Sequence, residues 1–202
     1  MTELNIKIMI PNKGIRLTMG LVLLIVVTAC GDAPMPKPRG YFRITMPEKK
    51  YQPMPDGYPY RFEYPVYANI EKDKDANAEP YWINVAFPAM KAKVHISYRN
   101  IQKNFNTLEE DSHMLAYKHT VKADAINERY FINPDKKVYG VYYEIKGDAA
   151  SRIQFVVTDS LRHHLRGSLY FNVTPNKDSL APVVDFVSRD VLHMMETFEW
   201  ND

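Results

Sequence analysis

The stretch YWINVAFPAMKAKVHISY, Tyr81 to Tyr98, decides the fold class, because its apolar side chains recur at every second position. The alternating residues of its two halves are Tyr81, Ile83, Val85 and Phe87, then Ala92, Val94, Ile96 and Tyr98. Such alternation is typical of strands with one buried and one solvated face. The short link Pro88-Ala89-Met90 favours a hairpin, so the pattern predicts two antiparallel strands.

Four more strands are expected further along the chain, in segments rich in β-branched and aromatic residues. Their expected ranges are 128–132, 137–145, 152–158 and 165–173. Asn133-Pro134-Asp135 and Gly147-Asp148 supply residues typical of the turns between the first three of them.

Two helices are expected as well. Thr107-Leu108-Glu109-Glu110 matches a capping box, which predicts a helix that begins there and runs to about Lys122. Near the C-terminus, Pro182 suits the first turn of a second helix. Apolar residues follow it at helical spacing: Val183, Val187, Val191, Met194 and Phe198. The pattern predicts an α+β fold, an antiparallel sheet with two helices, of which the C-terminal one packs on the sheet. This order of elements resembles the PsbP/Mog1-like sandwich.

The N-terminal region predicts export and lipidation. The apolar run 17–29 is shorter than the roughly 20 residues that a membrane-spanning helix needs, and it follows the basic residues Lys7, Lys13 and Arg16. Cys30, the single cysteine, directly follows Val27-Thr28-Ala29 and resembles the lipidated cysteine of a bacterial lipobox. The alternative is an ordinary secretory signal with an incidental cysteine. A disulfide framework is excluded, because it needs an even set of cysteines.

These features predict three parts: a lipoprotein signal peptide at 1–29, a lipidated Cys30 with a proline-rich tether at 30–59, and a single α+β domain at 60–202. Eight of the 14 prolines lie between Pro34 and Pro65, which favours an extended tether. Without residues 1–29 the chain carries 23 basic and 23 acidic residues. A neutral domain gives no electrostatic basis for binding nucleic acid, so acyl chains are the expected membrane anchor.

The most reactive-looking stretch is Thr158 to His164, where Asp159, Ser160 and His163 are the candidates for a hydrolase site. A nucleophilic serine needs a base within hydrogen-bond reach, and no GxSxG elbow is present. A polar turn between two strands is the favoured interpretation. The sequence holds no HExxH, CxxC or EF-hand pattern, so no metal or cofactor is expected.

Tyrosines fall on both faces of the expected strands, although a strand with one solvated face should alternate. The ones singled out are Tyr139, Tyr142, Tyr143 and Tyr170. Either helices cover both faces of the sheet, or part of this surface meets a protein partner, because tyrosine is enriched at interface cores. The second alternative makes these four residues candidate partner contacts.

Several long segments resemble the gliding motility lipoprotein GldD family of the Bacteroidota. They are PMPKPRGY after Cys30, HTVKAD (119–124), KVYGVYYEIKGDAASRIQFVVTDS (137–160), GSLYFNVTPNKDSLAP (167–182) and METFEW (195–200). The resemblance implies a cell-envelope lipoprotein, carrying fatty acid such as palmitate on Cys30, that serves gliding and associates with the type IX secretion machinery. It implies no catalytic residues.

The expected function is therefore that of a non-catalytic, lipid-anchored component whose partners are other gliding and secretion proteins. GDAPMPKP after Cys30 lacks the acidic cluster that resembles surface-export signals in this phylum, which favours a periplasm-facing position. Two alternatives stay open: a periplasmic lipoprotein that binds a small ligand or a peptide strand, and a hydrolase that uses Asp159, Ser160 and His163.

Overall fold

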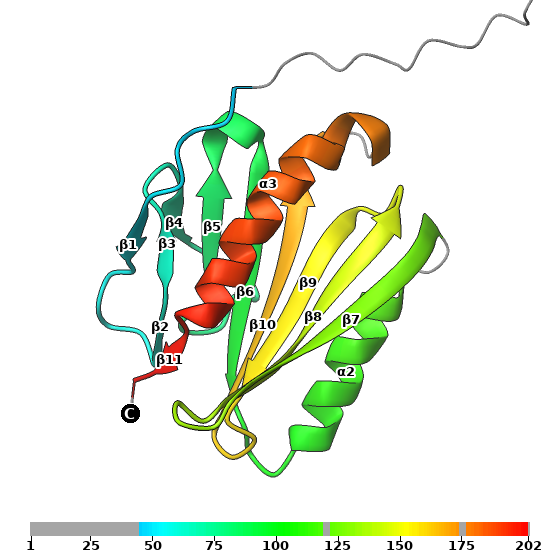
Figure 1. Cartoon of the computed structure of the whole chain (residues 1–202). Coiled ribbons are helices and arrows are strands. Elements are labelled where there is room, and N and C mark those ends of the chain that lie inside the picture. The colour runs from blue at the N-terminus through cyan, green and yellow to red at the C-terminus, as the bar shows by residue number, and fades with distance from the viewer. Residues whose placement is uncertain (1–44, 119–121, 174–176, 202) are drawn as a thin grey trace, which may run out of the picture. The chain divides into compact units, whose positions relative to one another are not determined.

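The computed structural model describes residues 45–118, 122–173 and 177–201 (Figure 1). The predicted signal peptide, Cys30 and the first part of the predicted tether lie outside these residues. The strands are β1 (Tyr51–Pro53), β2 (Tyr60–Arg61), β3 (Glu63–Pro65), β4 (Asn69–Lys72), β5 (Ile83–Phe87), β6 (Ala92–Asn100), β7 (Ala123–Asn133), β8 (Val138–Gly147), β9 (Ser151–Thr158), β10 (His163–Phe171) and β11 (Glu199–Trp200). The helices are the 3₁₀ turn η1 (Pro88–Met90), α2 (Phe105–Tyr117) and α3 (Lys177–Glu196).

Seven of these strands form one antiparallel sheet in the order β4-β5-β6-β10-β9-β8-β7. The hairpin predicted from the 81–98 stretch is confirmed, with Val85 opposite Val94 and Phe87 opposite Ala92. The four later strands are also confirmed, and β7 begins five residues earlier than expected. β10 pairs with β6 as well as with β9, so the last long strand lies in the middle of the sheet.

The two helices lie on opposite faces of the sheet, with α3 in front and α2 behind in Figure 1. Val187, Val191 and Met194 of α3 are buried in the main core, which also contains Tyr142. On the other face, Ala116 of α2 packs with Tyr143 and Val156 in a smaller cluster. The α+β prediction, with its C-terminal helix packed on an antiparallel sheet, is confirmed.

Both predicted helix starts are wrong. The amide of Leu108 already donates to the carbonyl of Asn104 at 3.0 Å, and α2 begins at Phe105, two residues before the proposed capping box. The Asn104 side chain accepts from the amide of Gln102 and does not cap the helix. Pro182 lies inside α3, which already includes Lys177, and not in its first turn.

Residues 45–59, which the sequence pattern assigns to the tether, pack against the domain. β1 pairs with β3, and Met54 is buried in the main core. Lys49 Nζ lies 2.5 Å from Oδ1 of the fully buried Asp190 on α3. The hydroxyl of Tyr51 donates to the same oxygen at 3.0 Å, and that of Tyr67 donates to Oδ2 at 2.8 Å. The folded unit thus begins before residue 60.

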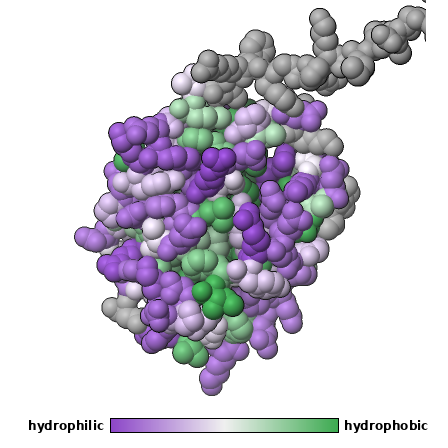
Figure 2. Space-filling view, in the orientation of Figure 1, coloured by the Kyte–Doolittle hydropathy of each residue, from purple (hydrophilic) through white to green (hydrophobic). Residues whose placement is uncertain are grey.

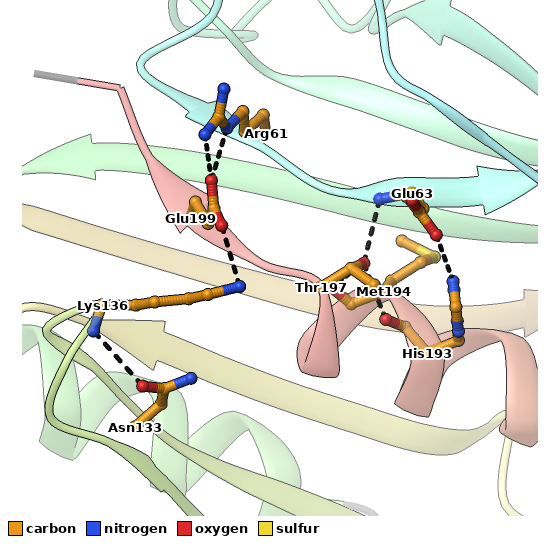
Figure 3. A network of polar contacts seen from close by, with 8 residues as sticks. All are labelled: Arg61, Glu63, Asn133, Lys136, His193, Met194, Thr197 and Glu199. Carbon is orange, nitrogen blue, oxygen red and sulfur yellow. Dashed lines mark hydrogen bonds and ion pairs between the residues drawn. The ribbon is translucent and has the colours of Figure 1, made fainter.

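The C-terminal strand is fixed by charged contacts, which Figure 3 shows from close by. Glu199 accepts from Arg61 and lies 2.8 Å from Lys136 Nζ in the turn between β7 and β8. Hydrogen bonds from Lys136 and then from Arg61 lower the pKa of Glu199. The Arg61–Glu199 contact joins β2 to β11. His193 Nε2 and Glu63 Oε2 are 2.8 Å apart, and this contact joins the end of α3 to β3.

Hydrophilic residues cover most of the side on which α3 lies, and hydrophobic residues appear there in smaller groups (Figure 2). The described helices include none that is both long and apolar enough to cross a bilayer.

Candidate functional site

A pocket of about 580 Å³ lies on the α2 side of the sheet. Strands β6 and β10 contribute side chains that point alternately to this side, including His95, Arg166 and Ser168. Helix α2 contributes Leu108 and Met114. The sheet side of the pocket is therefore polar, whereas the α2 side combines these apolar residues with Asp111 and Ser112.

A row of polar side chains crosses the sheet at this level. Asn84 of β5 is opposite His95, and His95 is opposite Ser168. Ser168 is in turn opposite Gln154 of β9, and Gln154 is opposite Tyr143 of β8. Directly opposed residues of neighbouring strands point to the same face, so all five share the α2 side.

Three members of this row carry buried atoms without hydrogen-bond partners among the described residues. They are Asn84 Oδ1, Gln154 Nε2 and Ser168 Oγ, and the three residues are at most 5% exposed. Leaving a buried polar atom unpaired costs about 1–3 kcal/mol, so such groups are uncommon in folded proteins. The row has more hydrogen-bonding capacity than the described chain uses.

Arg166 lies next to this row, two residues before Ser168 on β10. Its Nη2 donates to the Gln154 amide oxygen, and burial lowers the pKa of its guanidinium. Within the described residues, no carboxylate oxygen lies within 4 Å of this guanidinium. Arg99, which also lines the pocket, differs because it pairs with Glu79 at 3.2 Å. Arg166 is thus a largely buried cation without an acidic partner there.

Acidic side chains also line the pocket, namely Asp73, Asp75 and Asp111. Burial lowers the pKa of the His95 imidazole, and the nearby charge of Asp73 opposes this only in part. His95 is therefore neutral at pH 7 and adds no second positive charge beside Arg166. The His95 ring meets the edge of the Tyr170 ring, with 5.6 Å between centroids.

The three residues proposed for a hydrolase lie elsewhere: Asp159 and Ser160 are in the turn between β9 and β10, and His163 is the first residue of β10. Asp159 Oδ1 accepts from the backbone amides of Leu161, Arg162 and His163 at 2.8–3.0 Å. His163 Nδ1 is 2.7 Å from the hydroxyl of Tyr98, and its ring stacks on Trp200. Ser160 is exposed and has a φ of 65°. These contacts fit the polar turn, because the Asp159 carboxylate accepts three backbone amides at this turn.

Replacing Asp159 by alanine is expected to destabilise the domain by about 2–3 kcal/mol, because buried backbone amides lose a charged acceptor. Burial alone raises the pKa of Asp159, but its amide partners and the His163 charge lower it overall. A lowered folded-state pKa means that this stabilisation is complete above about pH 4 and is lost as the pH falls further. Urea unfolding at several pH values should show the difference between wild type and variant shrinking below pH 4. An unchanged difference would contradict this role.

The four candidate partner contacts fall into two groups. Tyr142 and Tyr143 are 2% and 5% exposed, because α3 covers the first and α2 the second. Neither ring is accessible to a partner while the domain keeps this structure, so two-sided helix coverage explains them. Tyr139 is half-buried, and Tyr170 is 37% exposed at the pocket.

Sequence reasoning did not find the pocket. The available signal was the alternation of polar residues in β10, where His164, Arg166 and Ser168 share one face. An arginine and a serine that face a covering helix from a central strand are unusual. The sequence does not reveal that β10 is a central strand, so this signal could not be used. In the described part of the chain, no group of three or more His, Cys, Asp or Glu side chains is placed to hold a metal ion.

The sequence matches the family described as gliding motility lipoprotein GldD over residues 31–200. No protein with a curated description matches it. Among solved structures, the chain is similar to the solution structure of cyanobacterial PsbP (CyanoP) from Synechocystis sp. PCC 6803. That match has 11% sequence identity and a TM-score of 0.46, and it covers 84% of this chain and 100% of the other.

Proposed function

The chain belongs to the gliding motility lipoprotein GldD family, and we propose that it is a non-catalytic, lipid-anchored component of the gliding motility and type IX secretion machinery. The observation that carries this proposal is the extent of the family match, which spans residues 31–200 and so begins directly after Cys30. Membership implies a lipoprotein of the cell envelope with a role in gliding.

Cys30 is the proposed site of the lipid, with the signal peptide removed before it. Each buried CH₂ group of an acyl chain contributes about 0.8 kcal/mol to membrane binding, and one chain alone binds only weakly. The balanced charge after residue 29 offers no comparable attraction to lipid headgroups. Two or three acyl chains on Cys30 are therefore the proposed anchor, with the domain facing the periplasm.

The geometry of the β9–β10 turn supports a non-catalytic role, since the charge of Asp159 is used by backbone amides. A component that acts by binding other proteins needs a solvent-accessible surface for that contact. Tyr130 and Ile132 are 73% and 68% exposed on β7, the last strand of the sheet. An exposed edge strand with apolar side chains is suited to a protein contact. Together with Tyr139 and Tyr170, it is the proposed contact surface for other envelope proteins.

Ser160→Gly tests the absence of catalysis without damaging the fold. The substitution removes the hydroxyl, and glycine accepts the positive φ of this residue more readily than serine does. We expect a strain that lacks the wild-type gene to regain full colony spreading and secretion with this variant. Wild type expressed to the same level is the control. If the variant is folded and abundant but inactive, the hydrolase alternative replaces the proposal.

A further inference from the structure

The α2 pocket holds a charge and a hydroxyl that point to a ligand. Arg166 has no acidic partner within 4 Å among the described residues, and Ser168 Oγ is buried without a hydrogen bond although it lines the pocket. The two residues share one face of β10. We propose that this pocket binds a small monocarboxylate with an apolar body, and that its carboxylate lies against Arg166 and Ser168.

A carboxylate fits these groups for two reasons. The planar guanidinium presents parallel N–H donors that match the two oxygens of a carboxylate, and the serine hydroxyl adds a third donor. A buried charge is also unfavourable unless it is paired, so an anion that binds here compensates the cost of burying Arg166. Neutral ligands offer no such compensation.

The acidic residues that line the pocket favour a ligand with a single negative charge over one with two. Asp73, Asp75 and Asp111 line the same pocket and repel a dianion such as phosphate. His95 is neutral at pH 7, since burial lowers its pKa, and Arg99 is already paired with Glu79, so neither residue offsets these carboxylates near Arg166.

The apolar residues in the pocket lining account for the apolar body of the ligand. Leu108, Met114 and Leu115 of α2 line it, as does Trp82, the residue before β5. Met114 is 49% exposed and Leu115 36% exposed, which is unfavourable for two large apolar side chains on one helix. The volume of about 580 Å³ lies within the range of small-ligand pockets. An acyl chain and the C-terminal residue of a hydrophobic peptide share this chemistry.

The test uses the full lipidated protein in nanodiscs, with empty nanodiscs as the blank. Ligand-detected NMR titrations would compare hexanoate, as an acyl carboxylate, with N-acetyl-L-leucine, as a peptide carboxylate. Their neutral amides and inorganic phosphate complete the set of probes. We expect at least one carboxylate to bind about tenfold more tightly than its amide, the value of one charge-assisted hydrogen bond. The preferred carboxylate identifies the source of the ligand.

Two pocket variants and one control separate binding from folding. Arg166→Gln should weaken carboxylate binding about tenfold, and Ser168→Ala about threefold, in line with the loss of a charged and a neutral donor. Ser168→Ala removes an unpaired buried hydroxyl, so its melting temperature should stay the same or rise, which keeps the test informative if Arg166→Gln does not fold. Arg129→Gln changes an exposed arginine of β7 on the face opposite to the pocket and should bind like wild type.

Three results would overturn the proposal. They are no carboxylate binding up to about 10 mM, equal binding of amide and carboxylate, and unchanged binding by folded Ser168→Ala. Tighter binding of phosphate would also contradict it. None of these outcomes bears on the motility role, which does not depend on this ligand.

Discussion

Cys30→Ser is expected to abolish fatty-acid labelling and to release the mature polypeptide from membranes. Serine cannot form the thioether that carries the diacylglyceryl group, and the balanced charge of the remaining chain provides no other strong attraction to lipid. Because the anchor consists of acyl chains, the effect should be nearly complete. Metabolic labelling with palmitate and a carbonate wash of membranes, followed by detection of the cleaved form, measure both effects.

Met35→Ser is the matched control, since it places the same residue in the same proline-rich segment without touching the cysteine. It should be labelled and stay with membranes like wild type. If the cleaved Cys30→Ser chain still sediments with washed membranes, or if wild type never incorporates palmitate, lipidation at Cys30 is wrong.

Asp190→Ala is expected to lower the free energy of unfolding by about 3–5 kcal/mol, the range for removing one partner of a buried ion pair. The side chain of Asp190 is fully buried and accepts from Lys49, Tyr51 and Tyr67. Without it, a partly buried ammonium and two hydroxyls lose their acceptor at once. Lys49 keeps only its bond to the Phe186 carbonyl and its position over the Phe186 ring.

Urea unfolding of the purified protein measures this loss. Asp185→Ala is the control, because Asp185 is exposed on the same helix, and it should change stability by less than about 0.5 kcal/mol. Limited proteolysis adds a local measurement, since cleavage near Lys49 should become faster in Asp190→Ala. A loss below about 1 kcal/mol would show that the N-terminal segment is not held by this cluster.

The long, regular elements were predictable because their patterns are local. The alternation from Ile83 to Tyr98 identifies a hairpin, and the spacing from Val183 to Met194 identifies a helix, each without reference to the rest of the chain. β1 and β3 were missed because they are three-residue strands that include Pro53 and Pro65. Both depend on partners more than 120 residues away in the sequence: Tyr51 of β1 contacts Asp190, and Glu63 of β3 contacts Thr197 and His193.

The candidate site was harder to predict because it depends on which strands become neighbours. Asn84, His95, Ser168 and Gln154 form one row only because β10 pairs with both β6 and β9. In the sequence, His95 and Ser97 have the pattern of a solvated strand face, and α2 covers part of that face only in the folded chain. The same argument applies to Tyr142 and Tyr143, whose burial requires helices on both sides of the sheet.

The proposed role rests on contact with other envelope proteins, and crosslinking tests it most directly. The lipidated wild-type protein would be crosslinked in intact cells and recovered from envelope membranes, and its partners would be identified by mass spectrometry against a strain without the tagged protein. We predict reproducible recovery of gliding or type IX secretion components, with lower recovery after Tyr130→Ser and Ile132→Ser together. Consistent recovery of no such component would contradict the proposed function.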